Sequence, residues 1–283
     1  HVCPRASMKA APHKNKHKGQ APLATAYGDS IHMDLAGPLP ASFVHGYKYA
    51  SIFVDRWSLH VGGYTIAKKS EHITIHKRYI ADHAHIGSHS IKEFHSDNGG
   101  EFCNRAYEQL IKDSAARKTT IVAKSPNMNP IAEALFWSLF STVRELLIDS
   151  GLPSEHWAVA FCHAVYLHNR MPHGKRVSPY ENVHGRQPDL SYVRVFGCLT
   201  HSLIHKTQRA SKLDEIAHTG FLVGHARYQR GWIVYVPKLQ RYITSRTIRC
   251  DERTMYKDIN AVPPTVKAPA PDSDSDNDDT PAP

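Results

Sequence analysis

The sequence has 283 residues, a formal net charge of +9 and a sequence pI near 9.3. This length suffices for one large domain or two smaller ones, and no apolar run approaches the roughly 20 residues that a bilayer span requires. The charge favours a polyanionic partner, nucleic acid first and an anionic membrane surface second. With no span and no signal peptide, we expect a soluble, intracellular protein.

The positive charge is unevenly distributed. Residues 263–283 carry Lys267 against five aspartates, a net charge of −4 that leaves +13 on residues 1–262. Residues 1–20 contain five Lys or Arg, no acidic residue and little apolar content, so they are predicted to form a basic arm.

Cysteine and histidine give no clear sign of a disulfide framework or a metal site. The cysteines are scattered and odd in number, and no CxxC pair occurs. Most of the 21 histidines lie singly on polar segments, so a solvated or hydrogen-bonded side chain is expected for nearly all of them. The five cysteines are Cys3, Cys103, Cys162, Cys198 and Cys250.

Strand-like and helical patterns follow one another along residues 30–172. Runs rich in β-branched and aromatic residues predict a three-stranded meander and two later strands, at 30–39, 47–57, 59–67, 90–97 and 118–125. Helical spacing predicts helices at 70–87, 104–117, 131–151 and 153–172. Strands followed by alternating helices and strands indicate a mixed α/β domain.

Beyond about residue 190 the pattern changes to short strands with turns. Gly224 and the Val236-Pro237 step are breaks typical of a small β unit. Residues 261–283 are rich in Pro, Ala, Asp and Ser and are expected to be disordered, because they cannot bury apolar area. The predicted organisation is a basic arm at 1–20, an α/β core at 21–175, a linker and β-rich domain at 176–260, and a tail at 261–283.

The helix at 131–151 has two distinct faces. One predicted buried stripe recurs every fourth residue: Ile131, Leu135, Leu139, Val143 and Leu147. Pro130 suits a helix start, because its missing N–H would have no partner there. A second face carries Glu133, Trp137, Phe140 and Arg144, so Glu133 is expected in the first turn and off the core stripe.

The stretch EFHSDNGGEF at 93–102 brings Asp97 to the end of a predicted strand. Asn98, Gly99 and Gly100 come next, and these residue types accept positive φ, so the strand ends in a turn. A turn-capping aspartate is the simplest interpretation. The positions of the other carboxylates are the evidence that distinguishes this role from a functional one.

Two more carboxylates lie in notable positions. Asp34 interrupts an apolar strand, and Glu133 opens the long helix with 35 residues between it and Asp97. Burying a lone carboxylate costs several kcal/mol. If the first and fourth strands are neighbours, Asp34 and Asp97 lie side by side, and such an all-oxygen cluster suits Mg²⁺ or Mn²⁺.

The motifs HMDLAGP, VDRWS, HSDNGGEF and IAE, with the 35-residue gap, resemble the DDE catalytic core of copia-type retrotransposon integrases. Later segments, including HWAVAFCHAVYLHNRMP and KLDEIAHTGFLVGH, resemble the stretch C-terminal to this core in the same Pol polyproteins. The resemblance covers roughly residues 3–253. It implies an RNase H-like fold with a five-stranded sheet, a metal-binding triad of Asp34, Asp97 and Glu133, and a structural role for Asp55.

The implied reaction is phosphoryl transfer with two divalent ions, Mg²⁺ or Mn²⁺, about 4 Å apart. Water attacks near the element's DNA end, and the freed 3′-hydroxyl then attacks host DNA. The implied partners are element and host DNA, further copies of the chain and other parts of the polyprotein, with a nuclear location and a cytoplasmic virus-like particle stage. The basic arm would contact the DNA backbone through Lys9, Lys14, Lys16 and Lys18.

The sequence departs from the family in two places. Relatives carry a zinc-binding His-His-Cys-Cys module before the core, and Cys3 resembles its last cysteine; Zn²⁺ needs four ligands and is expected only if the other three precede residue 1. We therefore expect a fragment of a longer polyprotein or a decayed copy. The usual Gln-Asn-Gly loop is also altered, with Pro130 after Asn129. The basic residues that follow the catalytic glutamate in relatives are replaced here by Ala134, Leu135, Phe136 and Trp137.

Three hypotheses remain open. The chain is a DDE integrase by descent, a catalytically inactive nucleic-acid-binding relic, or an RNase H-type nuclease. The third has less support, because the residues after 150 resemble integrase sequence. Metal-dependent strand transfer separates the first two, and hydrolysis of an RNA–DNA hybrid would support the third.

Overall fold

The computed structural model describes residues 24–86, 90–96, 105–120, 130–174 and 176–260. The predicted basic arm, the acidic tail and the turn that contains Asp97 lie outside these residues. In the described part of the chain, no helix is long and apolar enough to cross a membrane.

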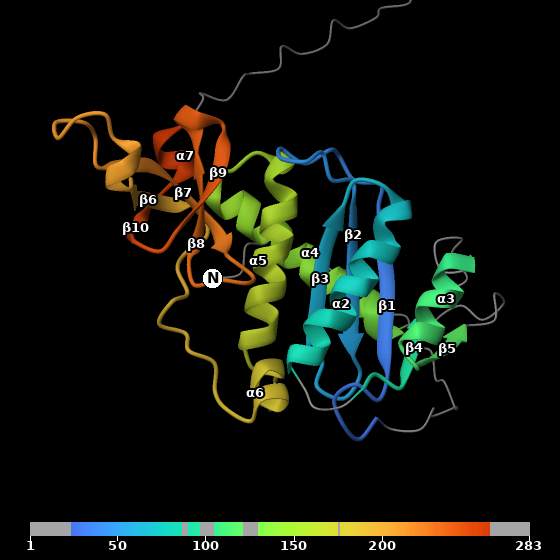
Figure 1. Ribbon diagram of the computed structural model, residues 1–283. Helices are drawn as coiled ribbons and strands as arrows, with labels where there is room; N and C mark the ends of the chain where they lie inside the picture. Colours follow the sequence, from blue (N-terminus) through green and yellow to red (C-terminus); the bar gives the residue numbers. More distant parts are fainter. Residues whose placement is uncertain (1–23, 87–89, 97–104, 121–129, 175, 261–283) are drawn as a thin grey trace, which may run out of the picture.

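The first sheet has five strands in the order β3-β2-β1-β4-β5, and it confirms the RNase H-like mixed sheet (Figure 1). β1, β2 and β3 form the expected antiparallel meander, and β4 and β5 extend it in parallel from β1. The first and fourth strands are therefore neighbours. The strands are β1 Ile31–Ala36, β2 Tyr49–Asp55, β3 Val61–Ile66, β4 Glu93–Ser96 and β5 Arg117–Thr120.

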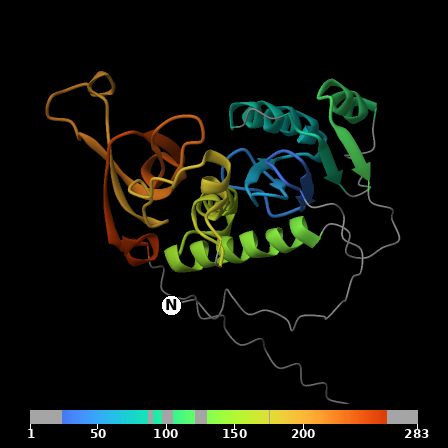
Figure 2. The ribbon, with the colours of Figure 1, turned by 90° about the horizontal axis from the view of Figure 1, so that it is seen from below.

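Helices cover both faces of this sheet, because side chains alternate between the faces along each strand. Ile52 and Val54 join a cluster with α4 and α5, whereas Phe53 between them joins a cluster with α2 and α3. Figure 2 shows α4 along one face and α2 and α3 along the other. The helices are α2 His72–Ile86, α3 Arg105–Asp113, α4 Pro130–Ser150, α5 Trp157–Arg170 and α6 Pro179–His184, with 3-10 turns η1 Lys69–Glu71 and η3 Ser154–His156.

The second unit is a five-stranded antiparallel sheet, as the short-strand pattern predicts. Its order is β10-β6-β7-β8-β9, and the pairing of β7 with β8 shifts between Leu222 and Gly224. Phe221 and Tyr235 share a hydrophobic cluster with Phe161 of α5, so this unit packs on the helices of the core. The elements are β6 Cys198–Leu203, η4 Lys206–Gln208, β7 Ala217–His225, β8 Trp232–Val236, η5 Pro237–Leu239, β9 Arg241–Ser245, β10 Ile248–Met255 and α7 Tyr256–Ile259.

The buried stripe of α4 differs from the predicted one. Its fully buried residues are Ala132, Phe136, Leu139 and Val143, whereas Ile131, Leu135 and Leu147 are half-buried. Apolar residues occur on almost every side of this helix, so spacing alone does not fix which of them faces the sheet. Phe140, predicted on the polar face, packs at the edge of the core.

The expectation that nearly all histidines are solvated or hydrogen-bonded is wrong for His76. His76 of α2 is fully buried, and neither of its ring nitrogens has a hydrogen-bond partner among the described residues. It lies one turn after the buried His72, on the side of α2 that faces the sheet. The neutral imidazole ring fills space as a flat aromatic group. The buried histidines are His32, His72, His76, His83, His156 and His163.

Candidate active site

Asp34 lies on β1, the middle strand of the first sheet, and is half-buried. It pairs with Ile52 across the antiparallel ladder, and its Oδ1 accepts a hydrogen bond from the Leu35 N–H at 2.8 Å. The strand alternates, so the buried Met33 points into the α2 cluster and Asp34 points to the other face. This is the face on which α4 packs.

Glu133 is exposed in the first turn of α4, as predicted. Its neighbour Ala132 is fully buried in the cluster that also holds Ala36 of β1, and α4 packs directly against β1 and β2. Asp34 and Glu133 therefore come from elements that are in contact on one side of the sheet.

Asp97 itself lies outside the described residues. Ser96, which precedes it in the sequence, is the fully buried last residue of β4. β4 runs parallel to β1, with Ile31 opposite Phe94 and His32 opposite His95. Within the described residues no group of three His, Cys, Asp or Glu side chains could hold a metal ion, so convergence of the three carboxylates stays a prediction.

The donor chemistry of the two described carboxylates suits a hard cation. Asp34 and Glu133 offer carboxylate oxygens, which are the ligands that Mg²⁺ and Mn²⁺ prefer. Glu133 is exposed and Asp34 is half-buried. The residues present therefore fit a divalent cation, with Asp97 as the expected third donor.

The face of α4 that follows Glu133 is only partly as predicted. Trp137, one turn later, is 74% exposed, whereas Phe136 is 6% exposed and packs in the core. Phe136 is thus a core residue, whereas Ala134 and Trp137 are exposed. A large exposed indole one turn from Glu133 is the main surface feature of this end of the helix.

Asp55 is structural, as expected. It is fully buried, and its oxygens accept hydrogen bonds from the Gly28 N–H at 2.8 Å and from the Ser58 N–H and hydroxyl at 2.7 Å each. Burial raises the pKa of this carboxyl, against the lowering effect of the Ser58 and Gly28 hydrogen bonds. Asp55 holds the turn after β2 to the loop before β1 and faces away from bulk solvent.

The remaining predicted site residues belong to the N-terminal arm. Cys3 and the arm lysines Lys9, Lys14, Lys16 and Lys18 lie outside the described residues. A zinc site at Cys3 and a DNA contact of the arm therefore stay predictions.

A cavity of about 680 Å³ lies where the second unit meets the core, and sequence analysis missed it. The Arg170 guanidinium lies 3.6 Å from the centre of the Tyr166 ring, which stacks on His225 of β7 at 4.0 Å. On the opposite wall, Asp82 of α2 accepts hydrogen bonds from the Tyr64 and Tyr228 hydroxyls at 2.8 and 2.9 Å. Six separate segments of the chain supply the lining of this cavity, so no local sequence motif predicts it.

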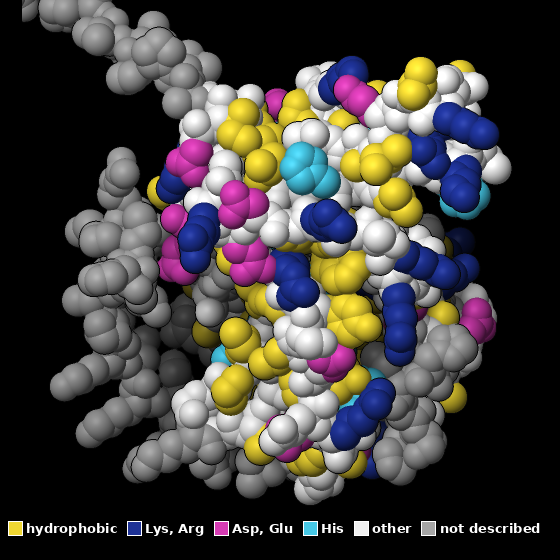
Figure 3. Space-filling model, turned by 90° about the vertical axis from the view of Figure 1, so that its left-hand side faces the viewer, with side chains coloured by type: hydrophobic (Ala, Val, Ile, Leu, Met, Phe, Trp, Pro, Cys, Tyr) yellow, Lys and Arg dark blue, Asp and Glu magenta, His cyan; other side chains and the backbone are white. Residues whose placement is uncertain are grey.

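The second unit carries a strong basic excess. Residues 198–260 contain eleven Lys or Arg against five Asp or Glu. Figure 3 shows one face of the molecule, on which Lys and Arg side chains lie mostly toward the right, hydrophobic side chains lie toward the middle, and acidic side chains gather at the left, with others at the top, the lower middle and the right edge. Such a surface is suited to a polyanion on its basic side.

Comparison with known proteins agrees with this architecture. Residues 198–264 match the family model of the retroviral polymerase SH3-like domain. A chain in the structure of the simian T-cell lymphotropic virus intasome in complex with the PP2A regulatory subunit B56 gamma aligns with a TM-score of 0.50 and 15% identity, over 85% of this chain and 84% of that one. At this identity the likeness concerns the fold alone.

Two curated relatives share sequence with most of the chain. The retrovirus-related Pol polyprotein from transposon TNT 1-94 of Nicotiana tabacum is 27% identical over 222 residues, 78% of this chain and 17% of that protein. The Pol polyprotein from transposon RE1 of Arabidopsis thaliana is 28% identical over 211 residues, 73% of this chain and 14% of that protein. The chain spans less than a fifth of the length of these relatives. It is a homologue of one segment of plant retrotransposon Pol polyproteins, with an RNase H-like α/β core followed by an SH3-like β unit.

Proposed function

We propose that the chain is an integrase of the DDE type by descent, whose reaction is divalent-metal-dependent 3′-end processing and strand transfer of element DNA into host DNA. The observation that carries this proposal is the placement of two carboxylates. Asp34 lies on the middle strand of the RNase H-like sheet, and Glu133 opens the helix that packs on this strand. Asp97 follows the end of β4, the strand beside β1.

The chain's own residues contribute position and charge. Asp34 is held by the ladder to β2, with β4 paired to the first two residues of the same strand, and Glu133 is held because its neighbours Ala132 and Phe136 are buried. Asp34, Asp97 and Glu133 would hold Mg²⁺ or Mn²⁺, which would lower the pKa of an attacking water or hydroxyl and stabilise the leaving oxygen. Rigid placement of ligands matters because phosphoryl transfer depends mainly on positioning and electrostatics.

Retention of activity is a separate question, and we propose that this copy joins strands poorly or not at all. Trp137 and Ala134 stand where relatives offer cations to DNA, and Pro130 replaces a glycine in the preceding loop. Each lost phosphate contact weakens DNA capture and misplaces the reacting ends. The alternative function is therefore a DNA-binding relic that retains the fold and the basic surface.

A strand-transfer assay separates the two functions. The substrate is a duplex that matches the element's own ends, with Mg²⁺ or Mn²⁺, and the product is compared between the wild type, Asp34→Asn and Asp97→Asn. Asp149→Asn is the matched control, because Asp149 is exposed near the far end of the same helix as Glu133. Joined product that is absent in both triad variants and present in the control establishes the enzyme. Absence of product in every variant, with DNA binding retained, establishes the relic.

Further properties belong to the same proposal. We propose DNA and further copies of the chain as partners, a nuclear location with a virus-like particle stage, and domains at 21–175 and 176–260. Binding of DNA through the arm at 1–20 predicts that its deletion flattens the salt dependence of affinity. An affinity insensitive to salt or to the deletion contradicts this role of the arm.

A further inference from the structure

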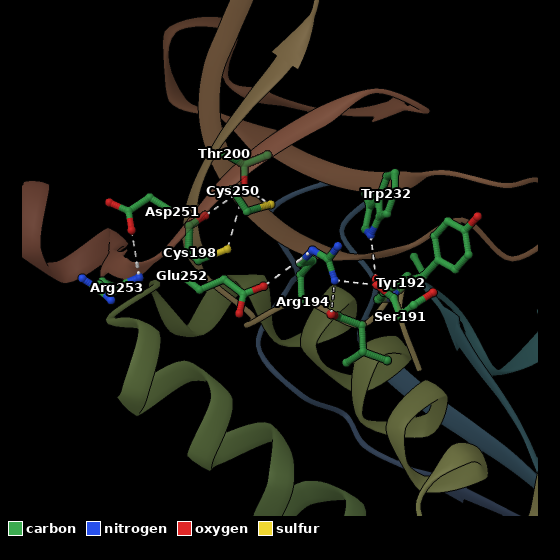
Figure 4. A network of polar contacts seen from close by, with 12 residues as sticks. Ser191, Tyr192, Arg194, Cys198, Thr200, Trp232, Cys250, Asp251, Glu252 and Arg253 are labelled. Atoms are coloured by element: carbon green, nitrogen blue, oxygen red, sulfur yellow. Dashed lines mark hydrogen bonds and ion pairs between the residues drawn. The ribbon is translucent and has the colours of Figure 1, made fainter. Parts of the chain in front are cut away.

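Two cysteines lie together on neighbouring strands of the second sheet. Cys198 opens β6, and Cys250 lies on β10, the edge strand beside it. The Thr200 hydroxyl oxygen lies 3.8 Å from the Cys198 sulfur and 3.4 Å from the Cys250 sulfur. Figure 4 shows the two thiols and this hydroxyl grouped between the strands. The fold thus brings together cysteines from positions 198 and 250. The sequence contains no CxxC motif that would predict this pair.

The two thiols differ in exposure and acidity. Cys198 is fully buried, whereas Cys250 is half-buried. A hydrogen bond from the Cys198 thiol lowers the pKa of Cys250 to about 6, with Thr200 and the nearby Arg194 acting in the same direction. The same hydrogen bond, together with burial, raises the pKa of Cys198. Cys250 therefore has the character of an attacking thiolate and Cys198 that of a resolving thiol.

We propose that Cys250 and Cys198 form a reversible, redox-sensitive disulfide in the SH3-like unit. In the first step the Cys250 thiolate attacks a peroxide, the O–O bond breaks, and sulfenic acid forms as hydroxide leaves; with hydrogen peroxide, a proton converts that hydroxide to water. In the second step the Cys198 sulfur attacks the Cys250 sulfur, a disulfide forms, and the sulfenic oxygen leaves as water with the Cys198 proton. Two cysteine sulfurs are oxidised and one peroxide is reduced, and a dithiol reverses the reaction by exchange.

The position of the pair gives the disulfide a structural consequence. β10 is an edge strand, and its pairing with β6 becomes irregular after Asp251, the residue that follows Cys250. Beyond the irregularity the Tyr256 N–H donates to the Gly197 carbonyl at 3.0 Å, beside Cys198. A disulfide would fasten the edge strand to β6 where the regular ladder stops. Oxidation is therefore expected to slow the opening of β10 and to protect its amides from hydrogen exchange.

Peptide mapping of the whole chain tests the proposal without any variant. The protein is treated with hydrogen peroxide, remaining thiols are alkylated, and trypsin is added without reductant. The expected product is a linked pair of peptides 195–206 and 250–253, lighter by two hydrogens than the sum of the reduced peptides, which disappears after dithiothreitol treatment. Absence of this linked pair under conditions that oxidise Cys162 overturns the proposal, as does linkage of Cys250 mainly to Cys3 or Cys103.

Variants then separate the two roles. Cys198→Ser is expected to increase at least several-fold the trapping of a Cys250 sulfenic acid by dimedone, because the resolving thiol is missing while the serine hydroxyl can still donate a hydrogen bond to Cys250. Cys250→Ser is expected to remove both the linked peptides and the dimedone adduct. Cys162→Ser on α5 is the matched control and should leave the linked pair unchanged. Equal dimedone labelling of Cys250 in the wild type and in Cys198→Ser would show that the two thiols do not react with each other.

Discussion

His76 provides a test of how much the stability of the fold depends on pH through a buried histidine in the aromatic core. Its ring lies 4.4 Å from the Phe94 ring, 5.2 Å from Phe53 and 5.3 Å from Tyr107, measured between ring centres. Burial lowers its pKa from 6.5 to about 3, with a smaller contribution from His72. In the folded protein the ring is therefore neutral throughout the mildly acidic range.

The direction in which pH changes the free energy of unfolding depends on whether the folded or the unfolded chain binds the proton at His76. Between pH 6.5 and 3 the unfolded chain binds a proton at this residue and the folded chain does not, so stability present above pH 6.5 is lost as the pH falls. Each pH unit in this range costs about 1.4 kcal/mol per buried histidine, so His76 alone costs about 1 kcal/mol between pH 7.5 and pH 5.5. Other histidines with pKa values lowered mainly by burial add to the slope: His60, His72, His156, His163 and His168.

The measurement is urea unfolding at pH 7.5 and pH 5.5, for the wild type and for His76→Leu. Leucine is similar in volume and has no polar atom, so the variant is expected to lie within about 1 kcal/mol of the wild type at pH 7.5. It should lose about 1 kcal/mol less than the wild type on acidification. His201→Leu on the exposed side of β6 is the control. If His76→Leu shows the same loss of stability with acid as the wild type, His76 is not a buried neutral ring and the reasoning fails.

Three further predictions concern packing, each checked by chemical denaturation. Asn169 of α5 donates a hydrogen bond to the Val61 carbonyl and accepts one from the Val61 N–H, both at 2.8 Å, on the free edge of β3. Asn169→Ala should lower the free energy of unfolding by about 2 kcal/mol or more, because two buried backbone groups lose their partners. An unchanged stability would contradict this. Phe136→Ala should cost about 3 kcal/mol, whereas Trp137→Ala at the adjacent exposed position should change stability by less than about 1 kcal/mol; equal losses would mean that the helix is rotated. Gly63→Ala should cost about 1 to 3 kcal/mol, because its Cβ would lie 2.6 Å from a methyl carbon of Val165, and a stabilised variant would show that β3 and α5 are less closely packed.

Strand composition predicted the core sheet well for a physical reason. β1, β2 and β3 follow one another along the chain and are buried on at least one face, so β-branched and aromatic runs and turn residues carry enough information. The parallel placement of β4 beside β1 is not local, and the sequence left it as a condition for bringing Asp34 and Asp97 together. The structure meets this condition, because β4 pairs with β1.

Sequence periodicity was less informative where apolar residues are abundant or polar residues are buried. α4 has apolar side chains around most of its circumference, so the true contact stripe through Ala132 and Phe136 could not be separated from that through Leu135. Nearly all histidines were expected to be solvated or hydrogen-bonded because they lie on polar segments, although the ring of His76 is buried among aromatic side chains. The Cys198 and Cys250 pair depends on strand register across more than fifty residues, which no local pattern encodes.

The same helix connects these observations to the proposed function. Phe136 and Ala132 anchor α4 on the sheet, and this anchoring is independent of what the exposed side carries. A copy that loses DNA-contacting cations therefore retains its fold and the position of Glu133. Trp137 lies on this exposed side: under the proposed function an indole there can pack on DNA but cannot neutralise a phosphate, so binding at this position would not respond to salt as lysine contacts do. A copy of the element can thus lose DNA binding while the positions of its carboxylates are retained. For this reason metal binding and strand transfer have to be measured independently.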